Sequence, residues 1–150
     1  MSYIKDKVVV ITGTGSGFGR IVACKAAARG ACVVGVDVNE VELANTVDMI
    51  TLKGGQGIGL RADVTDPGDM SAMVRTAVER FGKVDVLVNN AGIMPLAFFA
   101  DHAQAAQAWS RCIDINFKGV LNGICAVYDQ MIAQGAGHVI NLSSIYGNYP

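Results

Sequence analysis

The sequence predicts an α/β fold built on a parallel, doubly wound sheet with helices on both faces. Two observations predict this class. Short apolar runs alternate with longer helical stretches along the chain, and apolar residues make up 51% of the 150 residues whereas charged residues make up 17%. Strands that are buried on both faces have such a composition, and the alternation favours right-handed β-α-β crossovers. We expect a single domain over residues 1–150, with five strands in the order 3-2-1-4-5.

Two β-α-β units occupy the first half of the chain. Strands are expected over residues 7–12, 31–37 and 57–62. A first helix is expected over residues 17–29, where Gly30 ends it, and Asn39 is the expected N-cap of a second helix that stops at Gly54 and Gly55. The carboxyl ends of the first two strands should therefore form one edge of a crevice.

The second half of the chain continues this alternation. Asp66 and Pro67 provide an N-cap and a proline at the first helical position, and Gly82 ends this third helix. A fourth strand is expected over residues 84–88, a long helix over about 103–134 and a fifth strand over 138–142. We find no internal repeat and no linker between these elements.

Charge and apolar patterning argue against several classes of function. Twelve basic and thirteen acidic residues give a net charge of −1 without a like-charge block, so no nucleic-acid partner is expected. No apolar stretch reaches the roughly 18 residues that span a bilayer, and the N-terminus lacks a signal-peptide pattern. His102 and His138 have no partner at ligand spacing, so no metal site is expected. Four cysteines without a CxxC pair are expected to be small buried residues of a cytoplasmic protein.

A glycine-rich loop connects the first strand to the first helix. Residues 12–19 read TGTGSGFG, and a loop of this kind lets a phosphate approach the backbone and the N-terminus of the helix. The GxGxxG pattern of many dinucleotide-binding proteins is absent because Phe18 stands where its last glycine would be. GxGxG, which also occurs in S-adenosylmethionine-dependent methyltransferases, and TGxxxGxG are both present. The loop alone therefore leaves several ligands open, and a turn without a ligand as well.

Asp37 narrows the choice of ligand. It lies 18 residues after Gly19 at the end of the second strand, which is close to the spacing of a carboxylate that binds an adenosine ribose. A carboxylate at this point also repels a 2′-phosphate, and the loop carries Ser16 rather than an arginine or lysine. These residues favour NAD over NADP. A capping role for Asp37 is less well supported, because Asn39 is better placed to cap the next helix.

Asn116 interrupts an apolar stripe of the long helix. The stripe has helical spacing and comprises Trp109, Ile113, Val120, Ile124, Val127 and Met131. A buried amide needs hydrogen-bond partners. The residues alone favour a structural role in which Asn116 binds a neighbouring backbone segment.

Three further motifs lie at strand ends. Asp63 and Val64 close the third strand, Asn-Asn-Ala-Gly at 89–92 follows the fourth, and Asn-Leu-Ser-Ser at 141–144 ends the fifth, with Gly147 beyond it. Together with TGxxxGxG and Asp37, in this order and spacing, the chain resembles the short-chain dehydrogenase/reductase family from about residue 7 to residue 150. The resemblance implies a Rossmann-like fold and disfavours a methyltransferase.

The resemblance also implies roles for individual residues in binding NAD. The loop residues would hold the pyrophosphate, Asp37 the adenosine ribose, Asp63 and Val64 the adenine, and Asn90 the path to the nicotinamide. The implied cofactor-binding set is Gly13, Ser16, Gly17, Phe18, Gly19, Asp37, Asp63, Val64 and Asn90.

Two residues correspond to the family's catalytic positions. Ser144 matches the serine that hydrogen-bonds the substrate oxygen, and it is preferred over Ser143 because Gly147 completes the S-x-x-G frame of the family. Asn116 matches the asparagine that holds a water in the proton relay. Phe117, Leu121 and Tyr128 give the long helix a second apolar face, which matches the helix that family members often bury in a dimer contact. A homodimer or homotetramer is therefore expected.

The family's Tyr-x-x-x-Lys motif would begin roughly a dozen residues after the serine, beyond Pro150. Tyr146 and Tyr149 lie too close to Ser144 to replace it. We therefore expect the chain to be the N-terminal portion of a longer enzyme, and the C-terminal part of the usual domain to be missing. The expected activity of the parent protein is NAD-dependent hydride transfer to or from a secondary alcohol or ketone. The alternative is an NAD-binding module without catalysis.

Overall fold

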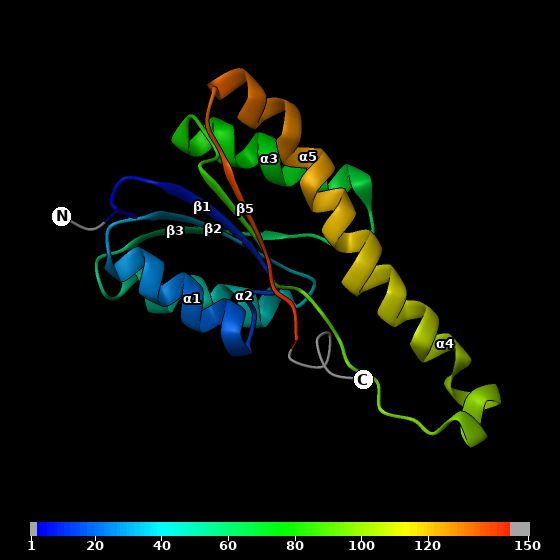
Figure 1. Ribbon diagram of the computed structural model, residues 1–150. Coiled ribbons are helices and arrows are strands. Elements are labelled where there is room, and N and C mark those ends of the chain that lie inside the picture. The colour runs from blue at the N-terminus through cyan, green and yellow to red at the C-terminus, as the bar shows by residue number, and fades with distance from the viewer. Residues whose placement is uncertain (1–2, 145–150) are drawn as a thin grey trace.

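A five-stranded parallel sheet forms the centre of the computed structural model, which describes residues 3–144 (Figure 1). The strand order is β3-β2-β1-β4-β5, which confirms the predicted topology. The strands are β1 Val8–Thr12, β2 Cys32–Asp37, β3 Gln56–Arg61, β4 Val86–Asn89 and β5 His138–Asn141. Each begins and ends within two residues of its predicted position.

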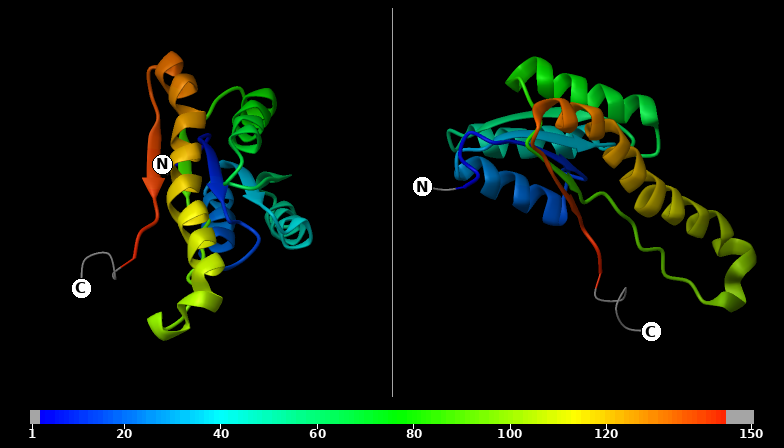
Figure 2. Two further views of the ribbon diagram at one scale, coloured as in Figure 1. Left: turned by 90° about the vertical axis from the view of Figure 1, so that its right-hand side faces the viewer. Right: turned by 45° about the horizontal axis from the view of Figure 1, so that its top comes forward.

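Helices cover both faces of the sheet. Helices α1 Gly17–Ala28 and α2 Glu40–Thr51 lie on one face, and α3 Pro67–Phe81 and α5 Gly119–Gln134 lie on the other (Figures 1 and 2). Successive side chains of a strand point to opposite faces. In β1, Val9 and Ile11 accordingly pack in the cluster under α1, whereas Val8 and Val10 pack in the cluster under α3 and α5. The central strands β1 and β2 are therefore buried on both sides, as the apolar composition predicts, whereas the edge strand β5 is largely exposed.

The predicted helix caps are present. The Asn39 side-chain oxygen accepts a hydrogen bond from the Glu42 N–H at 3.2 Å, and Asp66 Oδ1 accepts from the Gly68 and Asp69 N–H groups at 2.6 and 3.2 Å. Gly82 ends α3 in the left-handed region, with φ of 80°. These local interactions explain why the boundaries of α2 and α3 could be predicted from residue types alone.

The predicted single helix over residues 103–134 is instead a composite. A 3-10 turn, η1 Phe99–Asp101, leads into α4 His102–Ile113, and a π-helical stretch, η2 Asp114–Lys118, separates α4 from α5. A π stretch inserts an extra residue into the turn and shifts the helical phase. Ile113, expected in the buried stripe, consequently lies on the outer face and is 59% exposed. Figures 1 and 2 show α4 extending away from the sheet beside the segment that follows β4.

The expectation of buried cysteines is wrong for this chain. Cys24, Cys32 and Cys112 are half-buried, and Cys125 is exposed on α5. Cys125 is exposed because it lies on the outer face of α5, which no other described residues cover. No helix within residues 3–144 is both long and apolar enough to cross a membrane.

An ionic cluster joins the amino-terminal ends of β1 and β4. Asp85 accepts hydrogen bonds from the Val8 N–H at 2.8 Å and from Lys7 at 3.1 Å, and it pairs with Lys83 at 3.0 Å. Partial burial alone would raise the pKa of Asp85, but the Val8 hydrogen bond and the two lysines outweigh it and hold this pKa below its ordinary value. The ionised form therefore stabilises the pairing of these strands.

We expect Asp85→Asn to lower the stability of the full protein at pH 7 by about 1–2 kcal/mol, because charge-assisted hydrogen bonds are lost. A carboxyl with a depressed folded-state pKa contributes stability above its unfolded pKa, near 4, and loses that contribution as the pH falls through the folded pKa. The gap between the melting curves of wild type and variant should therefore narrow below about pH 4. Thermal unfolding at pH 7 and pH 3 measures this. Asp129→Asn, at an exposed position on α5, serves as the control, and a gap that is independent of pH would refute the assignment.

Candidate functional site

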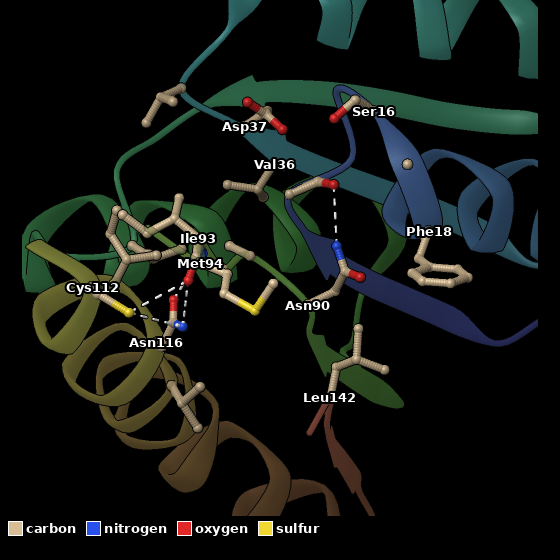
Figure 3. A pocket seen from close by; sticks show the side chains of 18 of the residues that line it. Ser16, Phe18, Val36, Asp37, Asn90, Ile93, Met94, Cys112, Asn116 and Leu142 are labelled. Carbon is tan, nitrogen blue, oxygen red and sulfur yellow. Dashed lines mark hydrogen bonds between the residues drawn. The ribbon is translucent and has the colours of Figure 1, made fainter. Parts of the chain in front are cut away.

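A cavity of about 810 Å³ lies at the carboxyl ends of all five strands (Figure 3). Its volume falls within the usual range for small-molecule sites, and its position is where open α/β sheets bind ligands. All of the predicted site residues except Gly19 line it. These are Gly13, Ser16, Gly17, Phe18, Asp37, Asp63, Val64, Asn90, Asn116 and Ser144.

The glycine loop leaves the N-terminus of α1 open. The Val36 carbonyl oxygen accepts from the Gly13 and Thr14 N–H groups at 2.7 and 3.1 Å, which ties the loop to β2. Ser16 occupies the N-cap position of α1 but makes no side-chain capping bond, and the first turn of α1 has no acidic residue. Helices α2 and α3, by contrast, carry side-chain caps and acidic residues in their first turns. The first amides of α1 can therefore bind an anion.

Gly19 does not line the cavity but packs against the backbone of the loop. It is buried in the first turn of α1, and a Cβ atom at this position would lie 2.0 Å from the Gly13 carbonyl oxygen and 2.6 Å from Asn90 Nδ2. Gly13 has φ of 71°, a conformation that favours glycine. These two glycines allow the loop, α1 and the end of β4 to approach one another closely.

Asn90 and Thr12 connect the ends of β1 and β4. Asn90 Nδ2 donates to the Thr12 and Gly13 carbonyl oxygens at 2.8 and 3.1 Å. The Thr12 hydroxyl oxygen accepts from the Asn90 and Ala91 N–H groups, both at 3.0 Å. Thr12 begins the TGxxxGxG motif, but the sequence alone predicts no role in the site for it. Its signal was a hydroxyl side chain that ends an otherwise apolar strand, and the structure shows that it orients the segment after β4.

Asp37 lies at the end of β2 with its carboxylate at the rim of the cavity, near Ser16 (Figure 3). Its Oδ2 accepts from the Gly15 N–H at 2.7 Å, and its Oδ1 accepts from the Asn39 N–H at 2.9 Å. Each carboxylate oxygen has a second lone pair that can accept a further hydrogen bond. The orientation of the carboxylate is thus set by the backbone, while acceptor capacity remains for a ligand hydroxyl.

Asp63 and Val64 form the part of the cavity wall after β3. Asp63 Oδ1 accepts from the Thr65 N–H at 2.9 Å and the Thr65 hydroxyl at 2.8 Å, and the Asp63 N–H donates to Asp69 on α3. The Val64 carbonyl oxygen accepts from Asn122 of α5 at 2.9 Å. Helices on one face of the sheet therefore hold both residues in place.

Asn116 binds the backbone, as its residue type alone indicates. Its Oδ1 accepts from the Ile93 N–H at 2.9 Å, and its Nδ2 donates to the Ile93 carbonyl oxygen at 2.8 Å (Figure 3). The expectation of a buried amide is wrong, because Asn116 lies in the π stretch and is exposed. Cys112, one turn earlier, lies 3.4 Å from Ile93 O and from Asn116 Nδ2 and also lines the cavity. Sequence reasoning missed Cys112, whose signal was its spacing of four residues from Asn116.

Ser143 and Ser144 both line the cavity, and both follow the end of β5 at Asn141. Neighbouring side chains within a strand point to opposite sides, but both serines lie beyond β5, so this alternation does not distinguish them. Gly147, which completes the S-x-x-G frame, lies outside the described residues. The preference for Ser144 stays a prediction based on that frame.

No group of three or more His, Cys, Asp or Glu side chains within residues 3–144 is arranged to hold a metal ion. The cavity instead combines an open helix N-terminus, an oriented carboxylate and, on its other side, amide and hydroxyl side chains. Such an arrangement suits an organic ligand that carries phosphate at one end.

A parallel sheet in the order 3-2-1-4-5, with a glycine loop and a cavity at the carboxyl ends of its strands, defines the class of Rossmann-like folds. Comparison with known proteins specifies the family. The family model for short chain dehydrogenases matches residues 7–150, and the chain belongs to this family.

Individual relatives agree with this assignment. The chain is 43% identical over 144 residues to the uncharacterized oxidoreductase Lmo0432 of Listeria monocytogenes, covering 96% of this chain and 57% of that protein. It is 35% identical over 147 residues to the 2,5-dichloro-2,5-cyclohexadiene-1,4-diol dehydrogenase LinX of Sphingobium indicum, covering 98% of this chain and 58% of LinX. A short chain dehydrogenase/reductase from Burkholderia phymatum, solved in complex with NAD, superposes with a TM-score of 0.91 at 39% identity and covers 98% and 52% of the two chains. The chain thus spans little more than half the length of these relatives.

Proposed function

We propose that the full protein is an NAD-dependent oxidoreductase that transfers a hydride between nicotinamide and a secondary alcohol or ketone. Residues 1–150 form the cofactor-binding part of its domain in this proposal. One observation carries it, namely that the open N-terminus of α1, the Asp37 carboxylate and Ser144 line one cavity at the carboxyl ends of the strands. The NAD complex of the Burkholderia phymatum relative supports it.

The residues present fit a dinucleotide. Gly13, Ser16, Gly17 and Phe18 would place the pyrophosphate at the first amides of α1, which lack a side-chain cap. The remaining lone pairs of Asp37 would accept hydrogen bonds from the two hydroxyls of the adenosine ribose, and the adenine would lie against Asp63 and Val64. A negative charge beside the ribose disfavours a 2′-phosphate, which supports NAD over NADP.

The catalytic part of the proposal concerns the other side of the cavity. Nicotinamide, when bound, supplies or accepts the hydride. Ser144 would donate a hydrogen bond to the substrate oxygen and stabilise the negative charge that develops there during the transfer. Asn116 holds Ile93 in place through two hydrogen bonds, and by family resemblance it would also position a water of the proton relay. LinX, which is described as a diol dehydrogenase, supports a secondary alcohol as the substrate class.

Ligand-induced stabilisation tests the function. A ligand that binds the folded state raises the melting temperature by mass action. We expect NAD to raise the melting temperature of the full protein more than NADP does, and S-adenosylmethionine not to raise it. A panel of secondary alcohols should then reduce NAD to NADH with the same preparation. Stabilisation by S-adenosylmethionine alone would refute the proposal, whereas NAD binding without any turnover would favour the non-catalytic module.

Replacing Asp37 should remove the preference for NAD. Asp37→Ala deletes two charge-assisted hydrogen bonds to the ribose and should raise the Kd for NAD about 10- to 100-fold. Asp37→Asn keeps the shape of the side chain, removes the charge and should improve NADP binding relative to NAD. Isothermal titration with both cofactors gives the two affinities.

The control for this pair of variants is Asp48→Ala, at an exposed position on α2. It removes a carboxylate from the next helix without touching the cavity. An unchanged ratio of NAD to NADP affinity in both Asp37 variants would exclude Asp37 from its proposed role.

The outer face of α4 and α5 supports the proposal of a homodimer or homotetramer. Apolar side chains recur there at intervals of four or seven residues and are between 51% and 70% exposed, namely Ile113, Phe117, Leu121, Tyr128 and Ile132. A contiguous apolar face of this kind marks an interaction surface. Sedimentation of the full protein at several concentrations tests self-association, and a monomer at all of them would refute it.

We also propose a cytoplasmic location. The four cysteines lie within the described residues and form no disulfide, which is the usual state in a reducing compartment. Cell fractionation with an antibody against the protein tests this location, and recovery outside the cytoplasmic fraction would refute it.

A further inference from the structure

A cluster behind the glycine loop connects the loop to α2. Arg20 Nη2 donates to the Gly15 carbonyl oxygen and to the Glu42 carboxylate, and Arg20 Nε donates to the Thr46 hydroxyl oxygen at 3.0 Å. The Thr46 hydroxyl in turn lies 2.8 Å from the Thr14 carbonyl oxygen. Arg20, Glu42 and Thr46 are not among the residues that line the cavity, so this cluster lies behind the cavity wall.

Thr46 and Asp37 hold opposite ends of one peptide group. The Thr14 carbonyl oxygen and the Gly15 N–H belong to the same peptide, and in a trans peptide these two groups point in opposite directions. Thr46 holds the carbonyl end at 2.8 Å, and Asp37 Oδ2 accepts from the N–H end at 2.7 Å. The Thr46 hydroxyl therefore helps to fix the direction of the Gly15 N–H, which together with the Asn39 N–H orients the Asp37 carboxylate.

The hydrogen bonds of this cluster form a continuous chain that starts at a cation and ends at an anion. Arg20 donates to Thr46, Thr46 donates to the Thr14–Gly15 peptide, and the peptide donates to Asp37. Each group in this series of hydrogen bonds donates to the next one on the way to Asp37, so each hydrogen bond polarises the next. The Thr46 hydroxyl has a single hydrogen, and its distance to Thr14 O is shorter than the 3.1 Å to Glu42 O.

Burial and charge favour one geometry for this chain. Thr14 and Thr46 are buried, with exposed fractions of 0% and 1%, so water cannot replace a missing partner cheaply. Glu42 holds the guanidinium of Arg20 in place, and the hydrogen bond and charge of Arg20 lower the pKa of Glu42. The ion pair thereby fixes the donor at the start of the chain.

We propose that Arg20 and Thr46 are positioning residues that determine how strongly the cavity prefers NAD over NADP, because they orient the Thr14–Gly15 peptide and through it the Asp37 carboxylate. This inference rests on the proposed function. It adds two residues outside the cavity to the determinants of cofactor choice.

Thr46→Val tests this series of hydrogen bonds, because it removes the hydroxyl and keeps the shape of the side chain. We expect the Kd of the full protein for NAD to rise about three- to tenfold, the effect of one lost hydrogen bond. The Kd for NADP should change less than about twofold, because a 2′-phosphate gains nothing from a well-oriented carboxylate. Thr46→Ser keeps the hydroxyl and should restore both affinities.

Thr51→Val is the matched control. Thr51 lies on the same helix, and its hydroxyl donates to the Val47 carbonyl oxygen at 2.9 Å without reaching the loop. It should leave both affinities unchanged.

If Thr46→Val does not fold, Arg20→Lys tests the same series of hydrogen bonds. It removes the Nε donor from a half-exposed position and should shift the ratio of the NAD and NADP affinities in the same direction.

A double-mutant cycle separates this positioning role from a general loss of structure. In an Asp37→Asn background the chain has no carboxylate to orient, so Thr46→Val should change the Kd for NAD less than about twofold. Equal weakening of NAD and NADP, or an undiminished effect in the Asp37→Asn background, would overturn the proposal. Failure of the wild-type protein to bind NAD would overturn the proposed function instead, so the two failures are distinguishable.

Discussion

Ser144→Ala is expected to lower the kcat of the full protein about 100- to 1000-fold, the usual effect of removing one hydrogen-bond donor to a developing oxyanion. Ser144 lines the cavity after β5, which is an edge strand of the sheet and is separated by β4 from β1 and the loop. Because its hydrogen bond would be strongest when the substrate oxygen carries most charge, the loss should fall mainly on kcat and less on KM. Steady-state kinetics with NAD and a secondary alcohol measure both constants, and the Kd for NAD should not change.

Ser143→Ala provides the matched control for this prediction. Ser143 is the preceding hydroxyl, and it lines the same cavity after the same strand. We expect its replacement to change kcat less than about fivefold, a loss far below that for an oxyanion donor. A larger loss at Ser143 than at Ser144 would transfer the catalytic assignment to Ser143. An unchanged kcat in both variants would remove this segment from the chemistry.

Gly19→Ala is expected to destabilise the protein even though alanine favours helices more than glycine does. The new Cβ would lie 2.0 Å from the Gly13 carbonyl oxygen and 2.7 Å from the Gly13 carbonyl carbon, both backbone atoms that cannot rotate away. Overpacking against the backbone should lower the free energy of unfolding by about 3 kcal/mol, the upper end of the usual range. The melting temperature should fall by about 6–12 °C. Displacement of the loop should also weaken NAD binding about tenfold or more.

Gly82→Ala separates this steric effect from the general cost of replacing a glycine. Gly82 has φ of 80°, and a Cβ atom there would meet nothing within 4 Å. Its replacement should cost about 1 kcal/mol from backbone strain alone and leave the Kd for NAD unchanged. A Gly19→Ala protein that melts and binds NAD like the wild type would contradict the close packing of α1 against the loop.

The features that could be predicted from the sequence depend on residues of two kinds. Some bind their near neighbours along the chain, and others end a strand of the sheet. Asn39 and Asp66 cap their helices through atoms two or three residues away, so residue type and position were sufficient. Asp37, Asp63 and Asn90 line the cavity because the carboxyl ends of parallel strands meet at one edge of the sheet. Once the strands were identified, their convergence followed from topology.

The part that could not be predicted depends on contacts between distant segments. The π stretch at Asp114–Lys118 breaks the 3.6-residue period, and Asn116 within it binds Ile93, 23 residues earlier. Periodicity assumes a regular helix and therefore predicts Ile113 in the apolar stripe, although its side chain lies on the exposed face. Thr46 reaches Thr14 across 32 residues, and nothing in the local sequence distinguishes it from Thr51 on the same helix.

Residue patterns were sufficient to predict the fold class, the order of the strands and the edge of the sheet where the site lies. Hydrophobic periodicity, caps and glycines act over a few residues, and parallel crossovers allow few topologies. Contacts between distant segments, by contrast, set which of these residues face the cavity and which support it. Gly19 packs against the loop instead of lining the cavity, and the Asn116 side chain binds the backbone of Ile93. Hydrogen bonds connect Arg20 and Thr46 to Asp37 through the Thr14–Gly15 peptide. The physical reason is that hydrogen-bond direction and close packing depend on which atoms meet, and that is settled only when α1, α2 and the strands come together.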